Sequence, residues 1–289
     1  MIIDGHVHIF GPPAYREEFL ERLHSAGFDG AVLLSVPPEP FPLLSGYEME
    51  RTAEARLENL MAWCEGPEEL IPVFWIHPEA GDALDQVGRA ASAGAKGFKV
   101  ICNSFFPGEE IPMKTFRAIA ETGLPVMFHS GILWDGAASS QYNRPAGFEP
   151  LITIPKLRFS LAHISWPWND ECIAVYGKFL NGLGVNPEVS AEMFVDTTPG
   201  TPEIYREDAL RKLYTIGYDV EHNVFFGSDG MAERYNSSWA KEWVERDGNI
   251  LDKLGRSETA KPRMFGENVL RFFKIVEKEV TYNTPAQGE

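Results

Sequence analysis

Eight short apolar segments alternate with amphipathic segments along the chain, and this alternation constrains the fold more than any other feature. The apolar segments are rich in Val, Ile and Phe and are bounded by Gly or Pro, which is typical of buried parallel strands. The segments between them repeat apolar residues at helical spacing, and several end at Gly. We expect strands at 2–8, 31–36, 71–77, 95–101, 125–129, 158–163, 189–196 and 223–227, and helices at 15–26, 51–64, 84–94, 113–123, 173–183, 204–217, 239–246 and 267–278.

Strands and helices in this order predict an α/β fold, the (β/α)8 barrel (TIM barrel), in which parallel strands close on themselves inside a ring of helices. A length of 289 residues is usual for such a barrel. No change in composition marks a domain boundary, so we expect residues 1–289 to form a single domain, with 284–289 as a flexible tail.

Composition excludes several classes of partner. The formal net charge is −16 and no Lys/Arg-rich run is present, which argues against nucleic acid and anionic membranes. No apolar run approaches the roughly 20 residues of a membrane span, and the N-terminus lacks the pattern of a signal peptide. The three cysteines are widely spaced, so neither a disulfide framework nor a cysteine zinc site is indicated. We expect a cytoplasmic protein that acts on a small molecule, and these features also allow a homo-oligomer.

Ionisable side chains recur at the ends of the predicted strands. Because the carboxyl ends of the strands of such a barrel meet at one rim, where its active sites lie, these side chains should gather there. Side chains alternate along a strand, so both histidines of the first strand share a face. The residues concerned are His6 and His8 in the first strand, His77 in the third, His129 in the fifth, His163 in the sixth, and Asp229 just after the eighth.

Imidazole and carboxylate groups are suitable ligands for Zn²⁺ and similar divalent ions. His6, His8, His129 and Asp229 would supply three nitrogens and one oxygen and leave a position for water, so we expect a metal site here. Zn²⁺ is the first choice, with Mn²⁺ or Fe²⁺ as alternatives. His77 lacks such partners, and a hydrogen-bonded residue of the rim is the simpler interpretation for it.

Several short motifs are spread over the whole chain. They are DGHVH at 4–8, FKV at 98–100, FHSG at 128–131, AHIS at 162–165, FGSDG at 226–230, RP-x₃-EPLI at 144–152 and GENVLRFF at 266–273. In kind and in order these motifs resemble the amidohydrolase superfamily, and more narrowly its amidohydrolase-related branch. That branch includes aminocarboxymuconate-semialdehyde decarboxylase and related metal-dependent hydrolases.

The resemblance implies roles for individual residues. It makes His6, His8, His129 and Asp229 metal ligands, in agreement with the reading of the rim residues above. It also makes His163 a catalytic residue that hydrogen-bonds the water or the substrate and transfers a proton. Asp229 could serve both as ligand and as the acceptor of the proton from water.

Lys99 belongs to the predicted fourth strand and could face the barrel interior. In some members of the superfamily a lysine at this strand is carboxylated and bridges two metal ions. A plain amine could instead contact the substrate or a neighbouring acid. We expect one metal ion in preference to two, and both roles of Lys99 stay open.

The loops after the fifth and sixth strands suggest how a substrate is held. Trp134, Tyr142 and Trp166 would lie where a pocket opens, as substrate contacts or as packing. Arg144 could bind a substrate carboxylate through its planar guanidinium group, or it could hold its loop through an ion pair.

Three functions are compatible with these residues. The first is a metal-dependent hydrolase acting on a small, carboxylated or cyclic substrate such as a lactone or an amide. The alternative is a metal-dependent, non-oxidative decarboxylase or hydratase of the same branch, which would use the same metal, His163 and Asp229. A barrel that binds a ligand without turnover is disfavoured, because all four expected ligands are present.

Overall fold

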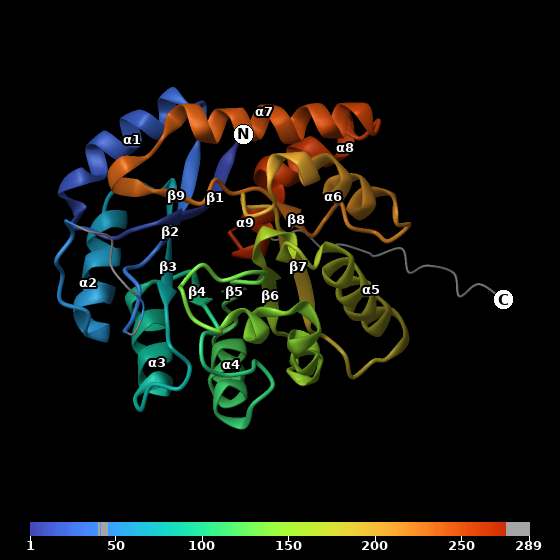
Figure 1. Ribbon diagram of the computed structural model, residues 1–289. Coiled ribbons are helices and arrows are strands. Elements are labelled where there is room, and N and C mark those ends of the chain that lie inside the picture. Colours follow the sequence, from blue (N-terminus) through green and yellow to red (C-terminus); the bar gives the residue numbers. More distant parts are fainter. Residues whose placement is uncertain (40, 42–45, 276–289) are drawn as a thin grey trace.

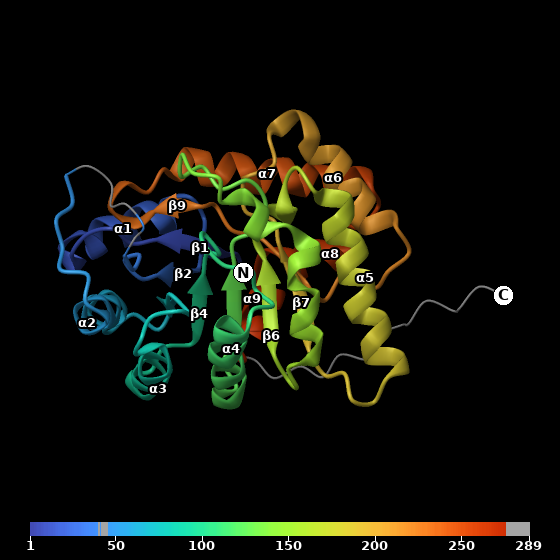
Figure 2. The ribbon, with the colours of Figure 1, turned by 60° about the horizontal axis from the view of Figure 1, so that its bottom comes forward.

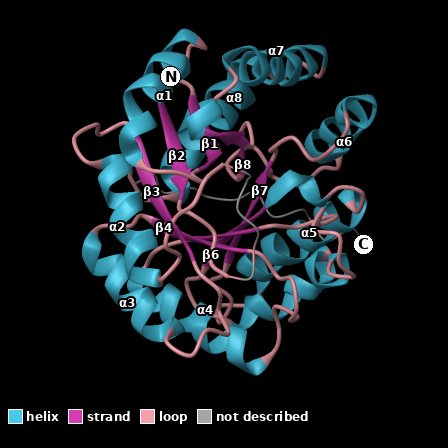
Figure 3. Ribbon diagram, turned by 60° about the vertical axis from the view of Figure 1, so that its left-hand side comes forward, coloured by secondary structure: helices cyan, strands magenta, loops and turns pink. Residues whose placement is uncertain are grey.

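A computed structural model describes residues 1–39, 41 and 46–275. Parallel strands surrounded by helices form a (β/α)8 barrel, which confirms the predicted fold class (Figures 1 and 3). The strands follow each other in the order β8-β7-β6-β5-β4-β3-β2-β1-β9. Their bounds are β1 Ile3–His8, β2 Gly30–Leu34, β3 Leu70–Trp75, β4 Gly97–Val100, β5 Val126–Phe128, β6 Arg158–Leu161, β7 Glu192–Asp196, β8 Val224–Phe225 and β9 Gly230–Met231.

The helices pack on the outer face of the strands, as Figure 2 shows for α3, α4 and α5. The α-helices are α1 Arg16–Ser25, α2 Ala53–Cys64, α3 Ala83–Ala93, α4 Glu110–Thr122, α5 Asn169–Val185, α6 Glu203–Thr215, α7 Ser237–Lys253, α8 Ser257–Pro262 and α9 Asn268–Phe272. Short 3₁₀ segments span Pro13–Tyr15, Ser140–Asn143, Pro145–Thr153, Ala162–Ser165 and Ala232–Arg234, and a π-helical turn spans Arg263–Glu267.

The barrel closes between its first and last strands. The Gly5 N–H donates to the Phe226 carbonyl at 3.0 Å, directly after β8. A Cβ at Gly5 would lie 2.4 Å from that carbonyl oxygen, so this approach of the two strands requires glycine. The chain then leaves the strand geometry, and β9 resumes pairing with β1 at Val7 and His8.

The eighth predicted strand was therefore wrong in its extent. The strand predicted at 223–227 is longer than β8, Val224–Phe225, and β9 was not predicted. Between β8 and β9 the backbone is irregular, and Asp229 has a φ of 58° there. The last predicted helix, 267–278, is also shorter in the structure, because a π-helical turn precedes α9 and α9 ends at Phe272. Residues 276–278 of that prediction and the predicted tail at 284–289 lie outside the described residues.

Helix α9 fills the amino-terminal end of the barrel. The Phe272 ring lies 5.0 Å from the ring of Phe194 and 5.3 Å from that of Phe225, both inside the barrel. Phe273 packs where Gly97 begins β4. Because aromatic side chains occupy this end, the open end of the barrel is the rim formed by the carboxyl ends of the strands. Within the described part of the chain, no helix has both the length and the apolar character needed to cross a bilayer.

Candidate active site

His6 and His8 of β1 project into the open end of the barrel, as the alternation of side chains predicted. His6 is completely buried, whereas His8 is partly open to the cavity above it. A Cβ at Gly227 would lie 2.5 Å from the Cβ of His6, so glycine allows the chain after β8 to pass directly against this histidine. The approach places the loop that carries Asp229 beside both imidazoles.

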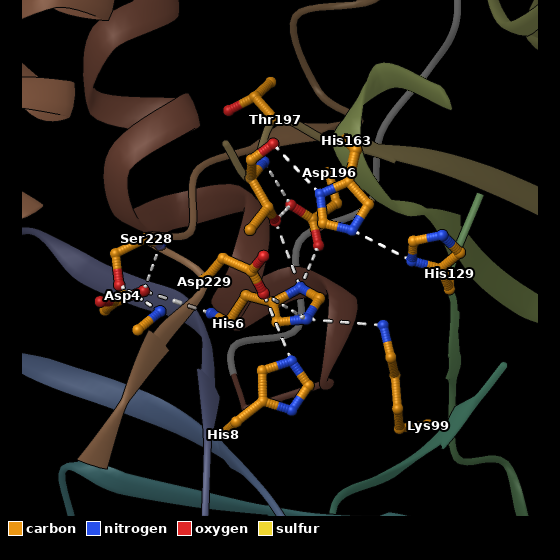
Figure 4. Close-up of polar contacts among 12 residues, drawn as sticks. Asp4, His6, His8, Lys99, His129, His163, Asp196, Thr197, Ser228 and Asp229 are labelled. Carbon is orange, nitrogen blue, oxygen red and sulfur yellow. Dashed lines mark hydrogen bonds and ion pairs between the residues drawn. The ribbon is translucent and has the colours of Figure 1, made fainter. Parts of the chain in front are cut away.

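The carboxylate of Asp229 faces both histidines of β1 (Figure 4). Its Oδ1 atom is 3.3 Å from Nε2 of His8 and 3.6 Å from Nε2 of His6. Burial acts to raise the pKa of Asp229, but the hydrogen bond from His8 and the neighbouring histidines outweigh it and hold the pKa well below its usual range. The carboxylate is therefore ionised at neutral pH.

The spacing of these three atoms fits a divalent metal ion. Ligands placed tetrahedrally at about 2.0–2.1 Å from Zn²⁺ are separated from one another by about 3.3 Å. Among the described residues, His6, His8 and Asp229 form the group whose donor atoms all lie within 4.8 Å of one another. Burial, together with the nearby Lys99, lowers the pKa of His6, so this ring is in the neutral form that binds metals.

Asp196, at the end of β7, fixes the orientation of His6. Its Oδ2 atom lies 2.7 Å from Nδ1 of His6, and both side chains are fully buried. An ionised carboxylate only accepts hydrogen bonds, so Nδ1 carries the hydrogen and the Nε2 lone pair faces Asp229. The Thr198 N–H and hydroxyl both donate to Asp196 and hold it in place.

Sequence reasoning missed Asp196 although a usable signal was present. The predicted seventh strand, 189–196, ended on this acidic residue, at the same rim position as His129 and His163 in their strands. The loop that follows is anchored from outside the barrel, because Arg206 of α6 donates to the Thr197 carbonyl and pairs with the buried Asp247 of α7.

His163 follows β6 in a turn with unusual backbone angles. Three consecutive residues, His163, Ile164 and Ser165, have φ values of 63°, 46° and 55°. Such angles are unfavourable for residues with a Cβ, and most of all for a β-branched residue, so packing around the turn must maintain them. The turn directs His163 into the cavity, where its side chain packs directly against the backbone of Gly200. A Cβ at position 200 would lie 2.7 Å from Cβ and Cγ of His163, so this contact requires glycine.

His129 and His163 take part in a chain of three contacts that cannot all be hydrogen bonds. Nδ1 of His129 lies 3.2 Å from Nε2 of His163, while Nδ1 of His163 faces the Thr198 carbonyl at 3.4 Å and Nε2 of His129 faces the Ile132 carbonyl at 3.2 Å. Burial lowers the pKa of both histidines, and two neutral rings carry two N–H groups for these three contacts. One contact therefore lacks a hydrogen.

Lys99 points from β4 into the same space as these histidines (Figure 4). Its Nζ lies 3.5 Å from Nε2 of His6, and only 1% of the residue is exposed. Burial lowers the pKa of Lys99 to about 8, against the opposing effect of Asp196 and Asp229. The predicted inward orientation of this lysine is thus observed.

These groups form the floor of a cavity of about 350 Å³ at the open end of the barrel. Trp134 and Trp166 contribute to its lining, as predicted, together with Phe10, Phe41, Trp75 and Ile101. The side chain of Asp229 lines this cavity and is 33% exposed.

Three other residues that the sequence singled out lie elsewhere. Tyr142 stacks edge-on against Phe106 with ring centroids 4.8 Å apart, which corresponds to the packing alternative. The Nε atom of Arg144 pairs with Glu171 at 2.7 Å, so the loop ion pair is the observed alternative. His77 packs its ring against Phe105, as a residue of the rim. None of the three is among the described residues that line the cavity.

Comparison with solved structures supports the fold at low sequence identity. A probable 2-pyrone-4,6-dicarboxylic acid hydrolase from Acinetobacter baumannii superposes with a TM-score of 0.63 at 14% identity, covering 94% of this chain and 99% of the other. A zinc-bound amidohydrolase from Burkholderia multivorans gives a TM-score of 0.63 at 11% identity, covering 95% and 99%. Dihydroorotase from Campylobacter jejuni gives 0.58 at 15% identity, covering 96% and 84%.

Sequence comparison identifies the family. No protein of curated function matches the chain. The sequence model of the amidohydrolase family, in contrast, matches residues 3–275, from the first residue of β1 to beyond α9, and thus includes every residue of the site described above. The chain therefore belongs to the amidohydrolase family.

Proposed function

We propose that this protein is a metal-dependent hydrolase that opens a small cyclic ester or amide with water. The observation that carries the proposal is the cluster of His6, His8 and Asp229 at the floor of a closed-ended cavity. The family and the named neighbours favour a hydrolytic or related reaction. One zinc-bound relative of the same fold supports the choice of Zn²⁺, with Mn²⁺ or Fe²⁺ as alternatives.

His6, His8 and Asp229 would hold the ion, and we propose His129 as the fourth ligand. If Nδ1 of His163 donates to the Thr198 carbonyl and Nδ1 of His129 donates to Nε2 of His163, the neutral His129 has no hydrogen on Nε2. This nitrogen then faces the Ile132 carbonyl oxygen with its lone pair. That nitrogen would therefore gain by turning toward a cation. A bound divalent ion would supply Lewis acidity and a lower pKa for a coordinated water.

The protein's own residues would transfer the protons. Asp229, which is ionised, would accept the proton as water adds to the carbonyl carbon of the substrate. The neutral His163 would then take this proton from Asp229 and deliver it to the ring oxygen or nitrogen as the bond between that atom and the carbonyl carbon breaks. His163 can take part because burial keeps it neutral, with one nitrogen able to accept a proton.

We propose one ion and a substrate contact for Lys99. Its amine lies beside His6 at the floor of the cavity (Figure 4), where it can donate to the carbonyl oxygen of the substrate. We also expect the protein to act in the cytoplasm, where Cys64, Cys102 and Cys172, which form no disulfide, would remain reduced.

Metal analysis combined with product analysis tests the proposal. The purified protein should contain close to one equivalent of metal, lose lactone or amide hydrolysis on chelation, and regain it with Zn²⁺. Activity in fully metal-free protein would contradict the metal dependence. Release of CO₂ from small carboxylic acids, without ring opening of any lactone or amide, would favour the decarboxylase alternative.

A further inference from the structure

The histidines, Lys99 and Asp229 lie at the floor of the cavity, and its wall is mostly apolar. Phe41, Trp75 and Ile101 form a cluster of their own at the mouth of the barrel, with Leu133 packed against it. The rings of Phe41 and Trp75 lie 5.2 Å apart, and the Trp75 ring lies 5.6 Å from His8. The apolar wall thus begins directly at a proposed metal ligand.

Trp134 extends this wall into solvent. It lies in the loop after β5, lines the cavity, and is 81% exposed. An indole group carries a large apolar surface, so leaving it in water is unfavourable unless something covers it. A flat apolar body in the cavity would cover this ring and the neighbouring Leu133.

The charges around the wall do not suit an anionic substituent. Among the described lining residues, Lys99 is the one Lys or Arg, and it lies at the floor. The charged residue near the mouth is Asp135, whose carboxylate accepts hydrogen bonds from the Ala137 N–H and the Ser139 hydroxyl. Arg144 is held outside by Glu171. A carboxylate on the part of a substrate that lies against the buried Trp75 and Ile101 would therefore be desolvated without a partner, and one nearer the mouth would face the carboxylate of Asp135.

We propose that the substrate places its hydrolysable carbonyl at the floor and an uncharged, flat, ring-bearing hydrophobic body against the wall, and that substrates with a carboxylate on that body are rejected. The inference rests on the proposed hydrolase function for the reaction at the floor. The wall residues, in contrast, determine only which body binds, so the two can be tested apart.

A matched pair of lactones tests the selectivity in the metal-loaded protein. Dihydrocoumarin takes up one water and opens to the hydroxyphenyl propanoic acid, and its partner is the same lactone with a carboxylate on the benzene ring. We expect kcat/KM to be at least about tenfold higher for the uncharged lactone, because an unpaired charge at a desolvated site is unfavourable by more than the 1.4 kcal/mol that corresponds to a factor of ten. Equal values, or a preference for the carboxylated lactone, would overturn the inference.

Two exposed positions of similar burial provide the variants. Trp134→Arg would place a guanidinium group at the wall and should reduce the preference for the uncharged lactone by at least about threefold through charge pairing. Ile204→Arg is the control, because Ile204 is 82% exposed on α6 and lies outside the lining of this cavity. If both variants change the ratio of the two kcat/KM values equally, the effect is a long-range electrostatic attraction and does not depend on the wall, which would contradict the inference.

Binding without turnover separates the two proposals. Chroman has the same fused rings as dihydrocoumarin but no carbonyl to hydrolyse, and isothermal titration can compare it with its ring carboxylate. Tighter binding of chroman than of its carboxylate supports the inference even if the protein opens no lactone. The absence of lactone opening would overturn only the hydrolase proposal. Equal or tighter binding of the carboxylate would overturn the inference whatever the activity.

Discussion

Asp196 offers the sharpest test of how the site is built, because it acts on a proposed ligand through one buried hydrogen bond. Asp196→Asn keeps the size of the side chain but removes its charge. The amide can also turn its NH₂ group toward His6, which would favour the tautomer with the hydrogen on Nε2. That tautomer has no lone pair for a metal ion on the atom that faces Asp229.

The magnitude follows from the 2.7 Å contact between two fully buried groups. A hydrogen bond to a charged partner is about twice as strong as one between neutral groups. Loss of such a partner of a metal-binding histidine typically lowers metal affinity about 10–100-fold, which corresponds to about 1.4–2.8 kcal/mol. We expect the Kd for Zn²⁺ to rise by this factor in Asp196→Asn.

Competition with a chromophoric chelator measures this Kd, and thermal unfolding of the metal-free protein reports the structural effect. Glu192→Gln is the matched control, because Glu192 lies at the opposite end of β7 and pairs with Arg158 and Arg271. The control should lower the Tm and leave zinc affinity unchanged. A wild-type Kd in Asp196→Asn, with a reduced Tm, would refute the reasoning and leave Asp196 with a purely structural role.

Further predictions concern the remaining groups of the site. His163→Asn should retain near-normal zinc affinity while kcat falls about 10²–10⁴-fold, as expected for loss of a proton-transfer group, and loss of zinc would instead identify His163 as a ligand. Gly200→Ala should lower kcat, since its Cβ would lie 2.7 Å from Cβ and Cγ of His163, and a wild-type kcat would mean that the ring is not held in one place. Arg144→Gln should leave KM unchanged and lower the free energy of unfolding by less than about 1 kcal/mol, because the ion pair of Arg144 with Glu171 is exposed. A raised KM would instead indicate that Arg144 binds a carboxylate of the substrate.

The barrel could be predicted because its signals are local. Each parallel strand is buried on both faces, so it appears in the sequence as a continuous apolar run such as Val126–Phe128, which needs no knowledge of its neighbours. The extent of the eighth strand was predicted wrongly because it is not determined by a local signal. Its interruption is produced by contacts with β1, above all the Ser228 N–H that donates to Asp4 at 2.8 Å, and such contacts leave no pattern within 223–227.

The rim residues could be predicted only as far as strand ends determine their position. Their positions at strand ends were enough to predict that His6, His8 and Asp229 lie close together and that His163 lies beside His129. The fate of a loop side chain depends on partners distant in the sequence, and the Arg144 pair with Glu171 joins two segments that no local pattern connects.

The seam between β1 and the chain after β8 explains why this site needs an irregular strand. A regular eighth strand would continue its pairing with β1 and would alternate its side chains strictly. Instead, two glycines allow the chains to touch, at Gly5 against the Phe226 carbonyl and at Gly227 against the Cβ of His6. The backbone then turns through the positive φ of Asp229 before β9 pairs again with β1. This turn directs a carboxylate toward both imidazoles of β1, so the unfavourable backbone angle and the charge cluster have one structural origin.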